Sequence, residues 1–246
     1  MNKLEIIAHR GFSAIAPENT KAAFLAAIEN GADSLEFDVQ FSADGVPVIF
    51  HDFNLDRTTN GKGKLREKNL AELKKLDAGM WFDRELSGEE ILTLEEGLEI
   101  LKAIHLFLYF DLKSYSEWSQ TEVEKFVEIV MNSEVKEKAV ITSFNENLKE
   151  GVREISGDEL NFGYLVANES SYQTQLAKAV EKGDRLISSS YNILLENPTL
   201  IEQTKSKGID VVAWTVDNPE EFQQLIDLGI TRIITNSLIG QLTTNN

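Results

Sequence analysis

Segments with the pattern of β-strands and segments with the pattern of α-helices alternate almost throughout this chain of 246 residues. Apolar runs of strand length, such as 4–8 and 34–41, alternate with stretches that have helical apolar spacing, such as 117–131. About eight such units predict an α/β protein with a (β/α)8 TIM barrel, a fold that typically needs ~250 residues. The alternative is a doubly wound open sheet, but the sequence has no glycine-rich dinucleotide or P-loop motif to favour it.

Residues 52–88 interrupt this alternation. They are polar and irregular apart from one short predicted helix at 70–76. We interpret them as a small insertion after the second strand region, on the catalytic face of the barrel. No linker rich in proline or serine divides the chain, so we expect a single domain over residues 1–246.

The chain is strongly acidic, with a formal net charge of −17 at pH 7. Such a surface repels nucleic-acid phosphates and anionic lipids, so we expect no nucleic-acid partner and no stable membrane association. A small anionic substrate would need a local pocket that carries cations or a metal ion. The sequence has no cysteine, no recognisable signal peptide and no apolar run of membrane-spanning length, which predicts a cytoplasmic protein.

Polar side chains collect where the predicted strands end. Active sites of TIM barrels lie at the carboxyl ends of the strands, so side chains at these positions are candidates for catalysis. The candidates are His9 and Arg10 after the first strand, Glu36 and Asp38 late in the second, His51 after the apolar run 46–50, and Asp111 and Lys113 at the end of the strand 107–112.

Strand geometry predicts that the acidic candidates converge. Residues two apart point to the same face of a strand, so Glu36 and Asp38 share one face, as do Asp111 and Lys113. Crowded carboxylates need a cation, and a hard divalent ion with oxygen ligands, Mg²⁺ or Ca²⁺, meets that need. Arg10 and Lys113 could bind phosphate oxygens, or they could merely pair with the acids.

The two histidines at strand ends suggest an acid and a base, because histidine has the side-chain pKa nearest neutrality. Taken singly, such a histidine is more often a hydrogen-bonded loop residue, and a Glu-x-Asp pair more often faces solvent. In a barrel these positions become neighbours, which favours a shared site over both of these alternatives. We interpret the third histidine, His105, as structural or exposed on the opposite side. Trp214 ends a late strand, where it either joins the core or lines a substrate pocket.

Many of these residues belong to a series of motifs, each weak alone but highly specific as an ordered set. In content and order the set resembles that of the glycerophosphodiester phosphodiesterases, and it spans nearly the whole chain. The motifs are His9-Arg10-Gly11, Pro17-Glu18-Asn19-Thr20, Glu36-Phe37-Asp38-Val39, His51-Asp52, Leu55-Asp56-Arg57-Thr58-Thr59, Thr93-Leu94-Glu95-Glu96, Asp111-Leu112-Lys113, Thr142-Ser143-Phe144 and Ala213-Trp214-Thr215-Val216.

This resemblance implies a (β/α)8 barrel with a small insertion and the hydrolysis of glycerophosphodiesters to sn-glycerol 3-phosphate and an alcohol. The roles that it implies are acid/base catalysis by His9 and His51, binding of one divalent cation by Glu36, Asp38 and Asp111, and phosphate contacts from Arg10 and Lys113.

The chain departs from the family pattern at two places. Asp111 stands where the family usually has glutamate, and its shorter side chain shifts the expected ion position or adds a water ligand. The last strand commonly reads Gly-Val-Asp-Gly-Ile-Ile-Thr-Asp, whereas residues 229–236 read Gly-Ile-Thr-Arg-Ile-Ile-Thr-Asn. We expect the second departure to affect local structure where the barrel closes, outside the catalytic set.

In the expected reaction, one histidine removes a proton from water or from the glycerol 2-hydroxyl, and the other donates a proton to the leaving alkoxide. We favour His9 as the base and His51 as the acid. Lysophospholipase D-type hydrolysis is the enzymatic alternative, for which the loop Met80-Trp81-Phe82 would offer a lipid-facing patch unless it packs the insertion onto the barrel. A barrel that binds a phosphorylated metabolite without catalysis is the alternative from a different class, and the complete set of candidate residues argues against it.

Overall fold

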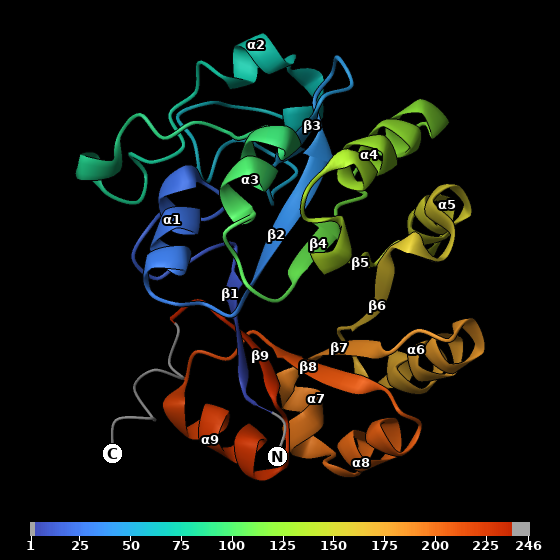
Figure 1. The fold of residues 1–246 in the computed structure, drawn as a ribbon. Helices are drawn as coiled ribbons and strands as arrows, with labels where there is room; N and C mark the ends of the chain where they lie inside the picture. Colours follow the sequence, from blue (N-terminus) through green and yellow to red (C-terminus); the bar gives the residue numbers. More distant parts are fainter. Residues whose placement is uncertain (1–2, 238–246) are drawn as a thin grey trace.

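In the computed structural model, which describes residues 3–237, eight parallel strands close into a barrel (Figure 1). The ring closes at the first strand, where Ile7 pairs with Ser34 on one side and with Ile234 on the other. This closure confirms the TIM barrel and excludes the open sheet. In ring order the strands are β1 (Glu5–His9), β2 (Ser34–Phe41), β4 (Leu108–Leu112), β5 (Ala139–Thr142), β6 (Asn161–Val166), β7 (Leu186–Ser190), β8 (Asp210–Trp214) and β9 (Arg232–Thr235).

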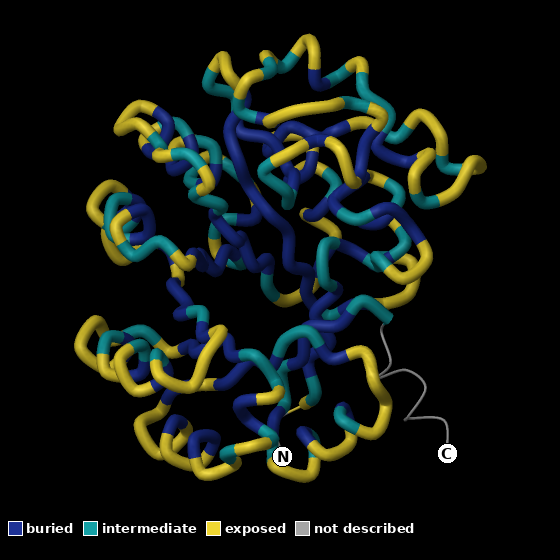
Figure 2. Tube along the Cα trace, turned by 180° about the vertical axis from the view of Figure 1, so that it is seen from behind, coloured by how far each residue is buried: buried dark blue, intermediate teal, exposed yellow. Residues whose placement is uncertain are grey.

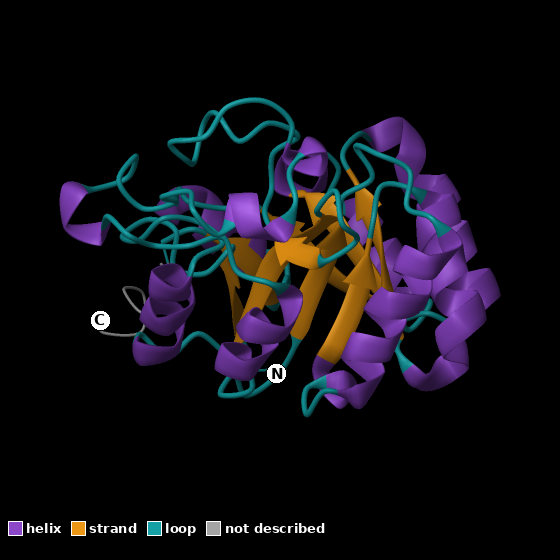
Figure 3. Cartoon of the chain, turned by 90° about the horizontal axis from the view of Figure 1, so that it is seen from above, coloured by secondary structure: helices purple, strands orange, loops and turns teal. Residues whose placement is uncertain are grey.

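Helices form a layer around the strands, as the view from above shows (Figure 3). Most begin at a side-chain cap, such as the Thr20 hydroxyl that accepts a hydrogen bond from the Ala23 amide. The helix over 191–196 was not predicted, because it follows a strand directly and its first turn has no side-chain cap. The helices are α1 (Lys21–Glu29), α2 (Leu70–Leu73), α3 (Leu94–Leu101), α4 (Gln120–Asn132), α5 (Glu146–Ser156), α6 (Glu169–Lys182), α7 (Tyr191–Glu196), α8 (Thr199–Ser206) and α9 (Pro219–Asp227).

The strands are almost entirely buried (Figure 2). Alternate residues along them belong to two different apolar cores. Phe37 and Phe110 face outward to the helices, with ring centroids 4.6 Å apart. Ile7 and Tyr109 face the barrel interior. By the same alternation, the polar side chains late in β2 and β4 point into the barrel interior, as the sequence predicts.

The segment between β2 and α3 forms the expected insertion above the barrel mouth. It begins with a short strand, β3 (Pro47–Ile49), which pairs antiparallel with the end of β2. Around α2 the insertion has a small apolar core of its own, which includes Leu55, Leu65 and Leu73. Met80 and Trp81 are exposed, and the Trp81 indole donates a hydrogen bond to the Ala78 carbonyl within the insertion.

Among residues 3–237, no helix combines the length and the apolar character needed to cross a bilayer.

The turn after β1 depends on a glycine. Gly11 has φ +84°, a conformation that side chains with a Cβ disfavour, and a Cβ there would lie 2.6 Å from the backbone carbonyl carbon of Ala23 in α1. Gly45 has a similar φ of +68° but no atom within 4 Å of the Cβ position. Substitution of Gly45 therefore tests backbone strain alone, whereas substitution of Gly11 tests backbone strain together with the close approach of α1.

We predict that Gly45→Ala destabilises the protein by about 1–2 kcal/mol through backbone strain alone. Gly11→Ala is expected to lose a further 1–3 kcal/mol or so, because α1 must move away from the turn. Chemical denaturation of the two variants measures the difference. Equal losses would contradict the close approach of α1 to the end of β1.

Candidate active site

His9 ends β1 and turns its ring into the mouth of the barrel. Its Nδ1 lies 2.7 Å from Asn236 Oδ1, and its Nε2 lies 3.8 Å from Glu36 Oε2. Burial, reinforced by the neighbouring Arg10 charge, lowers the pKa of His9 to about 4. The ring is therefore neutral near pH 7 and can accept a proton.

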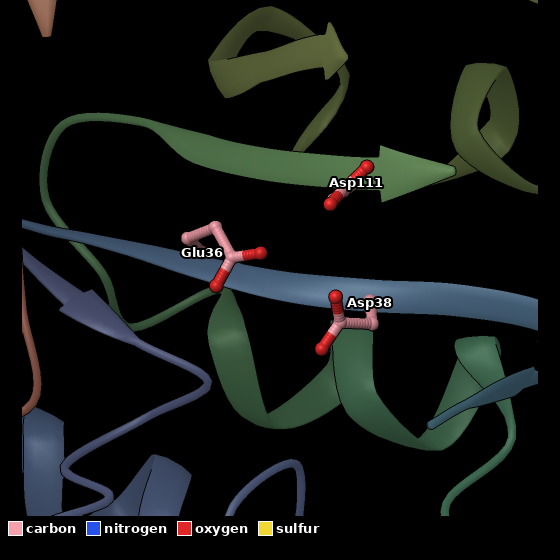
Figure 4. Close-up of side chains that lie close together, drawn as sticks. All are labelled: Glu36, Asp38 and Asp111. Atoms are coloured by element: carbon pink, nitrogen blue, oxygen red, sulfur yellow. The ribbon is translucent and has the colours of Figure 1, made fainter. Parts of the chain in front are cut away.

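Three carboxylates meet across the β2–β4 ladder. Asp38 and Asp111 are paired directly in the register of the two strands, and Glu36 precedes Asp38 on the same face (Figure 4). One oxygen from each side chain lies within 4.8 Å of the others, and all three residues are buried. Among the described residues, Asp111 Oδ1 finds no hydrogen-bond partner although it is shielded from solvent. Such a set of oxygen donors fits a hard divalent cation.

The three carboxylates differ in how they hold a proton. Burial, with the nearby Asp38 charge, raises the pKa of Glu36 well above its usual range. Burial likewise raises the pKa of Asp111, against the opposing effect of Lys113. Burial acts in the same direction on Asp38, but Lys113 and Arg10 outweigh it and hold the pKa of that carboxyl well below its ordinary value. Of the three carboxyl groups, Asp38 therefore binds a proton least readily.

Two basic side chains lie against these acids. Arg10 has a left-handed backbone with φ 57°, and its Nε lies 3.2 Å from Asp38 Oδ2. Lys113 follows β4, with its Nζ 3.0 Å from Asp38 Oδ1 and 2.6 Å from Asp111 Oδ2. Both residues thus pair with the acids while they line the same pocket.

His51 is placed by a loop and not by a strand, because β3 ends at Ile49. The Gln40 amide donates hydrogen bonds to the carbonyl oxygens of Phe50, His51 and Asp52 at 2.8, 3.0 and 2.9 Å. Together with the bond from the Phe50 amide to the Asp38 carbonyl, they hold residues 50–52 around the Gln40 side chain. The loop therefore holds His51 in the mouth of the barrel.

A chain of charged groups supports His51 from the side. His51 Nδ1 lies 2.7 Å from Asp52 Oδ1, and Arg57 Nε donates to Asp52 Oδ2 at 2.7 Å. Hydrogen bonds from Arg57 and His51 outweigh burial and lower the pKa of Asp52 to about 2. Glu18 accepts hydrogen bonds from both Arg57 and Arg10 at 2.7 Å, which links the two sides of the site.

The structure brings all the predicted site residues to one pocket. Its opening is also lined by apolar groups, among them Phe144, whose ring centroid lies 6.3 Å from that of Trp214. His105 lies apart from the pocket, is exposed, and precedes β4 at the opposite end of the barrel. The predicted residues in the pocket are His9, Arg10, Glu36, Asp38, His51, Asp111, Lys113 and Trp214.

Sequence reasoning missed several supporting residues. Thr20 caps α1, and the preceding residue Asn19 donates a hydrogen bond to Asp38 Oδ2 at 2.7 Å, a contact that the sequence did not reveal. The change at 236 was expected to affect local structure where the barrel closes, and the sequence did not reveal that this residue also contacts a site residue. Since β9 pairs with β1, the residue after β9 lies beside the end of β1, and Asn236 contacts His9. The departure from the family pattern at this position was the available signal.

A parallel barrel that gathers two histidines, three buried carboxylates and two basic residues at the carboxyl ends of its strands defines the class of barrel phosphodiesterases. Residues 9–239 match the model of the glycerophosphoryl diester phosphodiesterase family, and the chain belongs to that family. Family membership confirms the resemblance found in the sequence.

Relatives and solved structures agree over almost the full length. A glycerophosphodiester phosphodiesterase of Caldanaerobacter subterraneus subsp. tengcongensis is 36% identical, over 95% of this chain and 94% of its own. A phosphodiesterase of Oleispira antarctica, solved in complex with the product sn-glycerol-3-phosphate, is 29% identical with a TM-score of 0.90, over 98% and 97% of the two chains. The glycerophosphodiester phosphodiesterase of Agrobacterium tumefaciens is 27% identical with a TM-score of 0.80, over 95% and 96%.

The raised pKa of Glu36 has a consequence for the metal-free protein. A carboxyl whose folded-state pKa is raised contributes stability below its unfolded-state pKa, and that contribution is lost as the pH rises through the folded-state pKa. Near neutral pH, Glu36 therefore destabilises the metal-free fold.

We predict that Glu36→Gln raises the melting temperature of the metal-free protein near neutral pH and abolishes its further rise with Mg²⁺ or Ca²⁺. For a domain of this size, each 1 kcal/mol corresponds to about 2–4 °C. The matched control is Glu5→Gln at the other end of the barrel, which should lower the melting temperature, because the Glu5 carboxylate is paired with Arg232 Nε at 3.0 Å. A wild-type melting temperature with an intact metal response in Glu36→Gln would contradict the prediction.

Proposed function

We propose that this chain hydrolyses glycerophosphodiesters to sn-glycerol 3-phosphate and an alcohol by metal-dependent acid/base catalysis. The observation that carries the proposal is the convergence of two histidines and three buried carboxylates in one pocket. Family membership supports it, as does the sn-glycerol-3-phosphate held by the similar Oleispira antarctica enzyme.

The proposed ligands of one divalent cation, Mg²⁺ or Ca²⁺, are Glu36, Asp38 and Asp111. The site offers only oxygen donors, which suits both ions, and the unpartnered Asp111 Oδ1 supports the assignment. When bound there, the ion supplies Lewis-acid stabilisation of the phosphoryl oxygens.

Arg10 and Lys113 are proposed to bind the phosphate. Their positive charges stand at the same mouth as the carboxylates, where they would offset the negative charge that builds on the phosphoryl oxygens in the transition state. Trp214, with Phe144 beside it, forms the apolar wall against which the carbon chain of the substrate would lie.

The different partners of the two histidines support the proposed roles. His9 is buried beside the Arg10 charge, faces a neutral amide and stays neutral, so its Nε2 would take the proton from the attacking hydroxyl. His51 Nδ1 lies 2.7 Å from Asp52 Oδ1, which fixes the orientation of the ring, so His51 would give a proton to the leaving alkoxide oxygen. The attacking hydroxyl is water or the substrate's own 2-hydroxyl, and in the second case the histidines exchange roles when the cyclic phosphate is hydrolysed.

Lysophospholipids are the second candidate substrate class. The observation that favours them is the apolar part of the pocket, to which Phe144, Leu165 and Trp214 contribute. The sequence-based expectations of a single domain over 1–246, a cytoplasmic location and no nucleic-acid partner stay predictions.

We predict that glycerophosphocholine and glycerophosphoethanolamine release sn-glycerol 3-phosphate with Mg²⁺ or Ca²⁺ and that EDTA abolishes the release. His9→Ala should lower kcat by about 10²–10⁴-fold, the typical contribution of a positioned base. Lysophosphatidylcholine serves as the competing substrate in the same assay. Release that persists in EDTA, or near-normal turnover by His9→Ala, would refute the proposed chemistry.

The acid and the base can be told apart by the leaving group. Glycerophosphate esterified to p-nitrophenol has a leaving group that needs no protonation, so His51→Ala should lose at least ~10-fold less activity on it than on glycerophosphocholine. His9→Ala should lose similar activity on both substrates. The reverse pattern would exchange the two roles.

A further inference from the structure

Asn236, the first residue after β9, connects His9 to a second carboxylate outside the metal site. Its Oδ1 lies 2.7 Å from His9 Nδ1 and 2.7 Å from the Ser13 hydroxyl. Its Nδ2 donates to Asp217 Oδ2 at 2.5 Å. Asp217 lies in the loop between β8 and α9, so three separate segments of the chain meet at this amide.

The orientation of the Asn236 amide follows from the chemistry of its neighbours. An ionised carboxylate can only accept hydrogen bonds, so the amide must turn its NH₂ group toward Asp217. Its carbonyl oxygen then faces His9 and can only accept. The His9 Nδ1 must therefore carry the hydrogen, and the lone pair of the neutral ring lies on Nε2.

We propose that Asp217 and Asn236 are positioning residues that fix His9 as the Nδ1–H tautomer, with its Nε2 lone pair directed into the active-site pocket. The inference rests on the proposed role of His9 as a base. When the attacking hydroxyl loses its proton to Nε2, the Nδ1–H bond to Asn236 stays intact. Asn236 neither gains nor loses a proton in this step.

Asp217 also makes structural contacts, and the test must separate their effect from that of the proposed positioning role. Its Oδ1 accepts hydrogen bonds from the Asn236 backbone amide at 2.8 Å and from the Thr235 hydroxyl at 3.0 Å. These bonds tie the loop after β8 to the end of β9 without involving His9. Thr235→Val removes one of them, keeps the side-chain volume in a fully buried position, and is the matched structural control.

The first test is spectroscopic and needs no substrate. The chain has three histidines, so the long-range ¹⁵N–¹H spectrum of the Mg²⁺-loaded protein is assignable with His9→Ala as reference. We expect His9 to be the Nδ1–H tautomer in the wild type and a mixture of tautomers in Asn236→Ala. An Nε2–H tautomer in the wild type, or an unchanged tautomer in Asn236→Ala, would overturn the inference.

The second test is kinetic. Asn236→Ala should lower kcat by about 10²-fold with little change in KM, the effect expected when a reacting group is misplaced. Thr235→Val should keep kcat close to the wild type. The double variant Asp217→Asn with Asn236→Asp should restore most of kcat, because the amide and the carboxylate then exchange positions. The carboxylate at position 236 accepts a hydrogen bond from His9 Nδ1, and the amide at position 217 donates a hydrogen bond to that carboxylate.

The outcomes distinguish this inference from the proposed function. Near-normal turnover by His9→Ala would refute the base role itself. An inactive His9→Ala beside a fully active Asn236→Ala would refute only the positioning role. A folded exchange variant as slow as Asn236→Ala would also count against it, because the acceptor for His9 is then present without effect.

Discussion

In the closed barrel, Glu36 of β2 lies opposite His9 of β1, and Asp38 lies opposite Asp111 of β4. The acidic cluster at the centre of the site depends on this register, which buries three carboxylates within 4.8 Å of one another. Burying one charge without compensation is costly, and burying three is more so. Two features of the site reduce this cost. Arg10 and Lys113 form ion pairs with Asp38, and the pKa values of Glu36 and Asp111 are raised, so both bind protons more tightly than usual. A divalent cation would offset the same negative charge, which is why we propose the three carboxylates as its ligands.

The two histidines of the pocket are held by different partners. His9 is held by the neutral amide of Asn236, whereas His51 is held by the Asp52 carboxylate, itself fixed by Arg57. We propose that the two histidines serve as base and acid, each oriented by one neighbouring side chain.

The sequence predicted the barrel and the inward-facing residues because both follow from local periodicity. Alternation within β2 and β4 placed Glu36, Asp38 and Asp111 on interior faces, and the apolar spacing of most helices was clear. The register between strands was not predictable, since it depends on packing around the whole ring. For that reason the contact between Asn236 and His9, which exists only because β9 closes onto β1, could not be found from spacing. Helix α7 was missed because it has neither a cap nor the length for a periodic pattern.

We propose that Glu36, Asp38 and Asp111 together take one divalent cation in exchange for protons. Titration calorimetry of Mg²⁺ and Ca²⁺ into the metal-free protein, repeated near neutral pH in buffers of different ionisation enthalpy, counts both the ions bound and the protons released. We expect one ion bound per chain with proton release, and we expect the proton release to disappear in Glu36→Gln. Binding with no proton release, or no binding to the wild type, would contradict it.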